Sequence, residues 1–205
     1  MLLYVDSQYT SPYAMSVFVA LKEKGIGFEE RTLDLEAGAR HAPAFAAQSL
    51  TQRVPTLVDG EFRLSESSAI TEYLDEAYPG TPLYPADPKL KARARQVQAW
   101  LRSDLLPIRQ ERSTLVVFYQ PSDAPLSASA QAATHKLFAA AEALLPEGAE
   151  HVCGNWSLAD VDLAVMLQRL IRNGDPVPPR LRAYAERQWQ RATVQAWVKR
   201  ARPPL

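Results

Sequence analysis

The stretch Arg53–Ile70 (RVPTLVDGEFRLSESSAI) contains residues at a spacing suited to binding a small anionic peptide. At its start, Pro55 has no N–H to donate and pushes Val54 towards an extended conformation. Val54 can therefore offer its backbone groups to an extended peptide that lies alongside. Near the end of the stretch, Ser65–Ser68 opens a helix, whose free N–H groups and dipole can hold an anion. The sequence thus predicts a peptide-binding edge and an anion site within one short segment.

These two features require a hairpin between them and a helix after them. Asp59–Gly60 separates the strand-like segments Pro55–Val58 and Glu61–Leu64, and an Asp-Gly pair tolerates the positive φ of a tight turn. Beyond Ser68, residues of the buried face recur at helical spacing: Ile70, Tyr73, Leu74, Ala77 and Tyr78. We expect a serine to cap this helix, with an acidic residue in its first turn. In the alternative interpretation, Ser65–Ser67 only caps the helix.

Another hydroxyl group lies at a predicted helix start near the N-terminus. Leu2–Val5 is a short apolar run typical of a buried strand. Pro12 suits the first position of a helix, which makes Ser11 the expected N-cap. The apolar face of this helix lies within Val17–Leu21, and Gly25 ends it. The Ser11 hydroxyl is therefore expected beside the positive end of a helix dipole.

Composition excludes several classes of protein. The 205 residues include 23 basic and 23 acidic side chains, and this balance argues against nucleic acid as a partner. No apolar run approaches the length of a membrane span, and the first residues lack the pattern of an export signal. Cys153 is the only cysteine, so neither an internal disulfide nor a cysteine-based zinc site is expected. We expect a cytoplasmic protein without a metal.

The order of elements predicts two domains. A second strand within Phe28–Leu35 and a partly helical stretch around Pro43–Ala47 complete a β-α-β-α-β-β-α order, which is that of a thioredoxin-like domain in residues 1–79. Residues 80–88 are proline-rich and form a stiff linker. Residues 89–205 lack strand character and should be all-helical. Helices are predicted at Lys89–Val117 with a bend at Pro107, Ser127–Leu145, Ser157–Ile171, Leu181–Arg187 and Thr193–Arg200.

Together these motifs resemble the cytosolic glutathione S-transferases. The Val54–Pro55 pair before a hairpin and the Glu66–Ser67 pair opening a helix are similar to that family's glutathione-binding segment. Trp156–Asp160 resembles its buried N-capping box, in which Ser157 and Asp160 cap a helix, a structural role. The resemblance covers essentially the whole chain and implies a thioredoxin-like domain followed by an all-helical domain.

The resemblance also implies residue roles. Ser11–Pro12 occupies the position at which other members place a thiol-activating serine or a cysteine, so Ser11 would stabilise the glutathione thiolate, as in tau-like and related bacterial members. Other hydroxyl donors nearby are Tyr4, Tyr9, Thr10 and Tyr13. The residue before a cis-proline, here Val54 before Pro55, would pair with the cysteinyl part of glutathione. Glu66 and Ser67 would hold its γ-glutamyl end. For its glycine carboxylate the possibilities are Arg53 and Arg40, with His41 and Gln52 as further options.

The implied activity is transfer of glutathione to a small electrophile, or reduction of an organic peroxide, by a homodimer. One alternative is a glutathione-dependent isomerase of the maleylacetoacetate type, and another is a non-catalytic glutathione-binding or interaction protein. The electrophile would lie among scattered side chains, for which the possible residues are Tyr9, Tyr13, Arg109, Arg112, Phe118 and Tyr119.

Overall fold

The computed structural model describes all 205 residues. Strand β1 (Leu2–Asp6) is an inner strand of a four-stranded sheet with the order β2-β1-β3-β4. β2 (Glu29–Leu33) runs parallel to β1, whereas β3 (Thr56–Asp59) and β4 (Phe62–Ser65) form an antiparallel hairpin on its other side. β1 can be an inner strand because all of its residues after Leu2 are buried. The predicted thioredoxin-like arrangement is confirmed.

The hairpin turn lies one residue later than predicted. Asp59 pairs with Phe62, so the two-residue loop is Gly60–Glu61. Gly60 has φ +59°, which is the conformation that favours glycine in such a turn. The hydroxyl groups of Tyr73 and Tyr78 both donate to the Asp59 carboxylate, and these bonds lower the pKa of Asp59.

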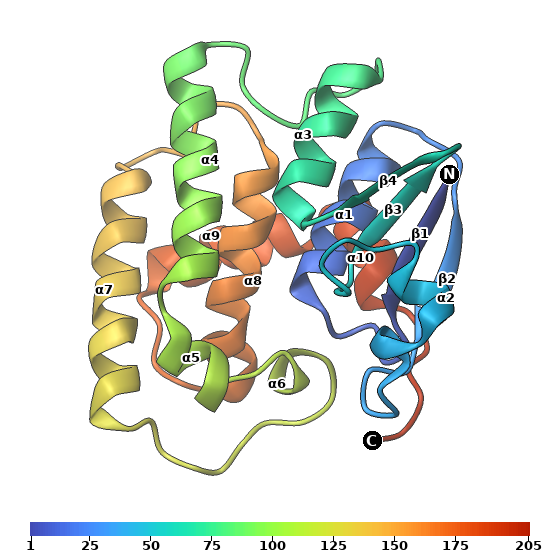
Figure 1. Ribbon diagram of the computed structural model, residues 1–205. Helices are drawn as coiled ribbons and strands as arrows, with labels where there is room; N and C mark the ends of the chain where they lie inside the picture. Colours follow the sequence, from blue (N-terminus) through green and yellow to red (C-terminus); the bar gives the residue numbers. More distant parts are fainter. The chain divides into compact units, whose positions relative to one another are not determined.

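Helices cover both faces of this sheet (Figure 1). On one face lie α1 (Pro12–Glu23) and α3 (Ser67–Ala77), which pack against each other. On the other lies α2 (Pro43–Ala46), after the 3-10 turn η1 (Ala39–His41). Phe45 of α2 contacts Tyr4 of β1, with ring centroids 5.2 Å apart. The partly helical segment around Pro43 is therefore confirmed as a short helix.

The last residues of the chain belong to this first unit, which comprises residues 1–83 and 192–205. In α10 (Ala192–Val198), Trp197 is fully buried, and its ring centroid lies 5.3 Å from that of Phe18 on α1. The Arg200 guanidinium then pairs with both carboxylate oxygens of Glu30 on β2. The sequence predicts one helical domain over residues 89–205, whereas burial of Trp197 against α1 joins the final helix to the unit that contains the sheet.

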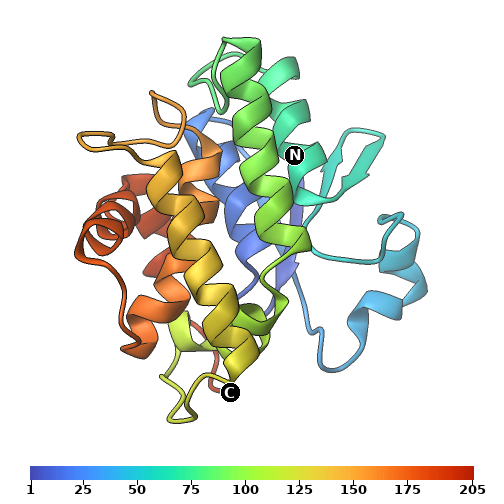
Figure 2. The same cartoon turned by 90° about the vertical axis from the view of Figure 1, so that its left-hand side faces the viewer.

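The second unit, residues 84–191, is all-helical. Its helices are α4 (Pro88–Ser103), α5 (Leu106–Glu111), α6 (Leu115–Phe118), α7 (Ala128–Leu144), α8 (Leu158–Asn173) and α9 (Pro179–Trp189). Figure 2 shows α4 and α7 side by side. The single helix expected over Lys89–Val117 is wrong, because three helices replace it. In a continuous helix Pro107 would clash with the carbonyl of Ser103, and α4 ends at Ser103.

α8 forms the centre of the second unit, and its start is the predicted capping box. Ser157 is its N-cap, and the Ser157 N–H donates to Asp160 Oδ2 at 2.9 Å. Asp160 Oδ1 accepts from the Val152 N–H at 2.9 Å and from the Tyr184 hydroxyl at 2.8 Å. Asp160 is fully buried, and burial raises its pKa. The structural role predicted for this box is confirmed. No helix in the chain is long and apolar enough to cross a membrane.

Candidate functional site

The N-terminus of α1 borders a cavity of about 370 Å³ in the first unit. Its lining residues come from the end of β1, the start of α1 and the segment before β3: Asp6, Thr10, Ser11, Tyr13, Leu35, Arg40, Gln52, Arg53 and Val54. Four of the seven predicted site residues are thus brought together, namely Ser11, Arg40, Arg53 and Val54. Pro55, Glu66 and Ser67 do not line this cavity.

Ser11 is the N-cap of α1, as predicted. Its Oγ accepts a hydrogen bond from the Ala14 N–H at 3.2 Å. This bond uses a lone pair of the hydroxyl group and leaves its hydrogen unused. Capping the helix and donating to a ligand in the cavity are therefore compatible roles for the same side chain.

The loop before Ser11 is held by Asp6, a residue that the sequence analysis missed. Asp6 is only 5% exposed. One of its carboxylate oxygens accepts from the Thr10 N–H at 2.6 Å and from the Thr10 hydroxyl at 3.0 Å, and the other accepts from the Ser11 N–H at 3.1 Å. An aspartate at the end of a strand commonly satisfies the backbone of the loop that follows, and this was the available signal. Asp6 positions Ser11.

The other hydroxyl donors near Ser11 differ in where they lie. The Thr10 hydroxyl is already bonded to Asp6. Tyr4 is buried against Phe45, and the Tyr9 ring stands edge-on to Trp197 with centroids 5.6 Å apart. Neither of these two tyrosines lines the cavity, whereas Tyr13 does. The geometry leaves Ser11 and Tyr13 as the donors that border it.

The Val54–Pro55 peptide bond is cis, as the resemblance implied. Thr56 pairs with Ser65 across the hairpin, so the antiparallel register places Glu66 and Ser67 at the same end of the hairpin as Val54–Pro55. Ser67 is the first residue of α3 and is 4% exposed.

The serine cap expected for α3 does not form. Glu66 occupies the N-cap position with φ +74°, and no side chain bonds to the first amides of the helix. The alternative interpretation of Ser65–Ser67 as a helix cap is therefore wrong. A helix start without a capping side chain leaves its amides to solvent or to a ligand. Positive φ in a non-glycine residue is uncommon and concentrates at functional sites.

Two exposed arginines give the cavity a positive rim. Arg40 donates from Nε to His41 Nε2 at 3.1 Å, and His41 itself does not line the cavity. Arg53 lies next to Val54, and Gln52 also lines the cavity, with φ +50°. The only acidic residue in the lining is Asp6, whose oxygens already accept three hydrogen bonds. The cavity suits a ligand with a carboxylate group.

Two of the possible electrophile-contacting residues of the second unit, Arg112 and Phe118, are engaged by other residues of that unit. Both carboxylate oxygens of Asp175 accept from Arg112, at 2.7 and 3.0 Å, and this pairing raises the pKa of Arg112. Phe118 stacks on Trp189 with centroids 6.3 Å apart. Arg112 is therefore explained by its buried ion pair and is not available to a substrate.

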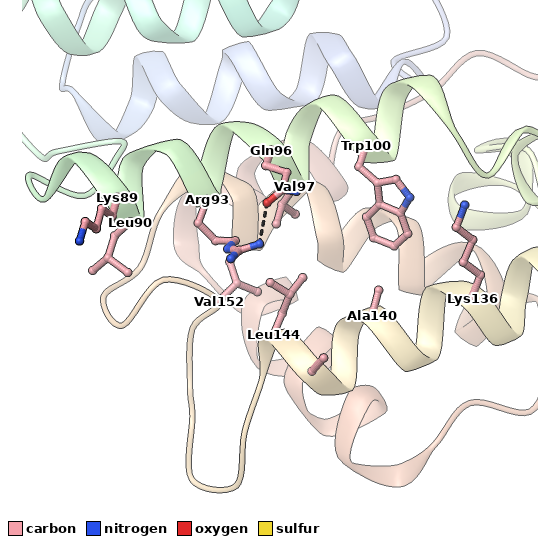
Figure 3. A pocket seen from close by; sticks show the side chains of 11 residues that line it. Lys89, Leu90, Arg93, Gln96, Val97, Trp100, Lys136, Ala140, Leu144 and Val152 are labelled. Carbon is pink, nitrogen blue, oxygen red and sulfur yellow. Dashed lines mark hydrogen bonds between the residues drawn. The ribbon is translucent and has the colours of Figure 1, made fainter.

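The second unit contains two larger cavities. One, of about 750 Å³, is a groove between α4 and α7, into which Trp100, Val97 and Leu144 point with Arg93 and Lys136 at its edges (Figure 3). The other, of about 790 Å³, lies between the start of α7 and the segment that connects α8 to α9. No cluster of three or more His, Cys, Asp or Glu side chains could hold a metal ion.

Comparisons with known proteins agree with this geometry. Residues 7–82 match the model of the glutathione S-transferase N-terminal domain, and residues 87–202 match that of the C-terminal domain. A glutathione transferase homolog from Burkholderia gl BGR1, solved with bound glutathione, is 46% identical, with a TM-score of 0.78 over 97% of this chain and 95% of that one. Maleylacetoacetate isomerase from Methylobacterium extorquens AM1, solved with malonate and glutathione, is 28% identical, with a TM-score of 0.78 over the whole of both chains.

Curated relatives match over shorter segments. Glutathione S-transferase theta-3 of Mus musculus is 36% identical over 104 residues, which is 50% of this chain and 42% of that protein. Maleylacetoacetate isomerase of Pseudomonas aeruginosa is 37% identical over 111 residues, which is 53% of this chain and 51% of that protein. The chain thus spans about half the length of the curated relatives that it matches.

Proposed function

Because the chain belongs to the glutathione S-transferase family, we propose that it is a glutathione transferase that activates the thiol of glutathione with Ser11. The cavity at the start of α1 carries this proposal, since Ser11, Val54 and two arginines line one volume. Val54, before the cis Pro55, would pair with the cysteinyl backbone of glutathione. Arg40 or Arg53 would bind its glycine carboxylate.

The γ-glutamyl end of glutathione would be held at the start of α3. The uncapped amides of α3 and the Ser67 hydroxyl suit its α-carboxylate, and the exposed Glu66 carboxylate suits its ammonium group. This arrangement explains why the first turn of α3 lacks a capping side chain of its own.

The magnitudes are sufficient for thiol activation without a metal or a histidine. A free thiol has a pKa of about 8.5, so only a few per cent is thiolate at neutral pH. Lowering that pKa by about two units requires roughly 2.7 kcal/mol of preference for the anion. A hydrogen bond from a hydroxyl group to an anion contributes about 1.5–3 kcal/mol, and the α1 N-terminus can add up to about 1–2 kcal/mol.

The reaction then follows from the thiolate. The thiol proton leaves to solvent, sulfur forms a bond to the electrophilic carbon, and the bond to the leaving group breaks. With an organic peroxide, sulfur attacks oxygen and the O–O bond breaks to release an alcohol. A second glutathione then forms the disulfide and releases water, so two thiols are oxidised for each peroxide reduced. Ser11 keeps its proton throughout and only donates a hydrogen bond.

The test is to titrate the thiolate absorbance of bound glutathione in the wild type and in Ser11→Ala. We expect the substitution to raise the midpoint pH and to slow turnover of 1-chloro-2,4-dinitrobenzene at neutral pH, with a much smaller change in glutathione affinity. Ser16→Ala is the matched control, because Ser16 lies in the same helix, is buried and has no hydrogen-bond partner.

Two outcomes would contradict the proposal. If Ser11→Ala keeps the wild-type midpoint and rate, Ser11 is only a helix cap, and Tyr13→Phe becomes the next variant. If the wild type binds glutathione but turns over neither electrophiles, nor cumene hydroperoxide, nor maleyl compounds, the chain is a non-catalytic binding protein.

A second candidate function is glutathione-dependent cis–trans isomerisation of a maleyl compound. It is favoured by the similarity to the maleylacetoacetate isomerases of Methylobacterium extorquens and Pseudomonas aeruginosa. In this reaction the thiolate adds to a double bond, rotation follows, and sulfur leaves again, so that glutathione is regenerated. Turnover of maleylpyruvate without net loss of thiol would identify this activity, whereas conjugation consumes one thiol for each electrophile.

We also propose that the protein is a cytoplasmic homodimer. The groove between α4 and α7 has a cationic edge formed by Lys89 and Arg93, whereas Lys136 at its other end pairs with Asp104. Leu90, which lines the groove, is 42% exposed. Phe62, which is 49% exposed, follows Glu61 at the hairpin tip. An aromatic ring with an adjacent acid complements an apolar groove with a cationic edge. A second copy of the chain would therefore place its hairpin tip in this groove.

Sedimentation equilibrium tests the dimer. We expect Arg93→Glu to weaken dimerisation at least about tenfold, and the double variant Arg93→Glu with Glu61→Arg to restore it, because the two charges are exchanged. A monomeric wild type would contradict the dimer itself. An unchanged dimer in Arg93→Glu would contradict this face as the interface.

A further inference from the structure

The cavity between α7 and α9 is a candidate for a second ligand, because all its lining residues lie in the second unit, whereas the cavity at Ser11 is lined by the first. Its volume is about 790 Å³. The α7–α9 cavity is lined by Pro125, Leu126, Gln131, Thr134, His135, Phe138, Asp175, Pro176, Val177, Pro178 and Arg182. The size is within the range of pockets that enclose small organic ligands.

The walls of this cavity are apolar and stiff. Leu126, Phe138 and Val177 provide aliphatic and aromatic surface, and three prolines fix the backbone around them. Proline restricts φ, so the walls lose little conformational freedom when a ligand enters. An apolar ligand body would gain burial here without the cost of ordering a loop.

Thr134 and Arg182, both in the lining, have side chains without a partner within the protein. The Thr134 side chain lies in a residue only 7% exposed, and its Oγ1 is buried without a hydrogen bond. The Arg182 guanidinium, on α9, makes no hydrogen bond or ion pair. A buried hydroxyl group without a partner is costly, and a ligand oxygen reached by rotation about χ1 would supply one.

The cavity has a net positive charge, because its one acidic residue is neutralised by an arginine outside the lining. Asp175 is its only acidic residue, and Arg112 neutralises it through two hydrogen bonds of 2.7 and 3.0 Å. Arg182 therefore faces no competing anion from the lining. The start of α9, an 11-residue helix, also lies here, since Pro178 is its N-cap. Its dipole favours an anion at the same end as Arg182.

We propose that the α7–α9 cavity binds an amphipathic monocarboxylate, such as a medium-chain fatty acid. The carboxylate pairs with the Arg182 guanidinium, the Thr134 hydroxyl donates to one of its oxygens, and the hydrocarbon body packs on Phe138 and the proline walls. The ligand is held in addition to glutathione and is not consumed in the transferase reaction.

Calorimetric titration of sodium decanoate into the full chain saturated with glutathione tests this proposal. We expect one saturable site for each chain. Arg182→Gln should weaken decanoate binding by about tenfold or more, since a hydrogen bond to a charged group is lost. Thr134→Val, which keeps the side-chain shape, should weaken binding a few-fold. Neither variant should change binding of the uncharged analogue 1-decanol by a comparable factor.

Arg187→Gln is the matched control. Arg187 lies on the same helix but outside the cavity, where it pairs with Glu150 at 3.0 Å. This variant should bind decanoate as the wild type does. The proposal is overturned if Arg182→Gln and Arg187→Gln have equal effects, or if the wild type shows no saturable binding. It is also overturned if adding glutathione to the unsaturated protein releases decanoate, because the site would then be the glutathione cavity.

Discussion

The N-termini of α3 and α8 contain the same types of residue, but only the N-terminus of α8 is capped by side chains. Each start contains a serine and an acidic residue within three positions of it, Glu66 and Ser67 in α3 and Ser157 and Asp160 in α8. At α8 the acid turns inward and accepts hydrogen bonds from the backbone of Ser157 and Val152 and from a tyrosine. At α3 the acid is exposed, its φ is positive, and no side chain caps the helix.

The first amides of α8 therefore have hydrogen-bond partners within the protein, whereas those of α3 are available to a ligand. We call these the complete and the open helix start. The open start of α3 is tolerated because the C-terminal end of the helix is fixed by hydrogen bonds and an ion pair. The buried Lys24 ammonium donates to the Tyr78 carbonyl at 2.9 Å and pairs with Asp75 at 3.1 Å. Asp59 accepts hydrogen bonds from two tyrosines of the same region. A helix fixed near its C-terminus can leave its first amides unsatisfied at modest cost.

The largest effect is expected at the complete start. Asp160→Ala removes the acceptor for four buried donors, and loss of one partner from a buried charged network costs about 3–5 kcal/mol. We expect a corresponding drop in the free energy of unfolding measured with urea, or a failure to fold. Asp123→Ala, at an exposed loop position, should leave stability unchanged. A melting temperature within about 2 °C of wild type for Asp160→Ala would show that the network contributes little.

At the open start the effect should appear in binding. Ser67→Ala is expected to weaken glutathione binding by about ten- to a hundredfold, because a hydrogen bond to a charged group contributes roughly 1.5–3 kcal/mol. Stability without the ligand should hardly change. Ser68→Ala, one residue further along α3, is the control and should bind normally. Unchanged calorimetric affinity with a lowered melting temperature would instead make Ser67 a structural residue.

The two N-cap serines offer a finer comparison. Ser157→Ala and Ser11→Ala should each lower stability by about 0.5–2 kcal/mol, the range for loss of a capping side chain. Only Ser11→Ala should also change the pH dependence of turnover, since Ser11 borders a cavity and Ser157 is fully buried. Urea unfolding combined with pH–rate profiles separates the two effects. A pH–rate profile altered equally in both variants would mean that capping alone explains Ser11.

The smallest effect is expected for the hydrogen bonds between Asp59 and the two tyrosines near the C-terminus of α3. Hydrogen bonds from Tyr78 and Tyr73 lower the pKa of Asp59 below its ordinary value of 3.8. The stabilisation is therefore fully present above about pH 4 and is lost as the pH falls through the lowered pKa. Because Asp59 is partly exposed, we expect about 1 kcal/mol or less. Asp59→Asn should flatten this part of the pH–stability curve, and an identical acid limb in both proteins would contradict the assignment.

Local sequence determined much of the fold and part of the site. The hairpin, whose turn lies one residue from the predicted place, the Ser11–Pro12 helix start and the Ser157–Asp160 box each depend on contacts within a few residues, so their chemistry could be recognised directly. The same holds for the pairing of Val54–Pro55 with a following hairpin. These features predicted the thioredoxin-like unit and two residues that line its cavity, Ser11 and Val54, while the family resemblance added Arg40 and Arg53.

Tertiary structure decided the features that depend on distant partners. α10 belongs to the unit that contains the sheet because Trp197 is buried against Phe18 of α1, and these two residues lie near opposite ends of the sequence. Arg112 is a structural residue because it meets Asp175, 63 positions later. The serines before α3 do not cap it, because the hairpin delivers the chain with Glu66 at positive φ. The spacing of apolar residues along the chain indicates where helices and strands form. Only the burial and pairing of residues across the fold determine whether a given serine or acidic side chain bonds within the protein or is left available to a ligand.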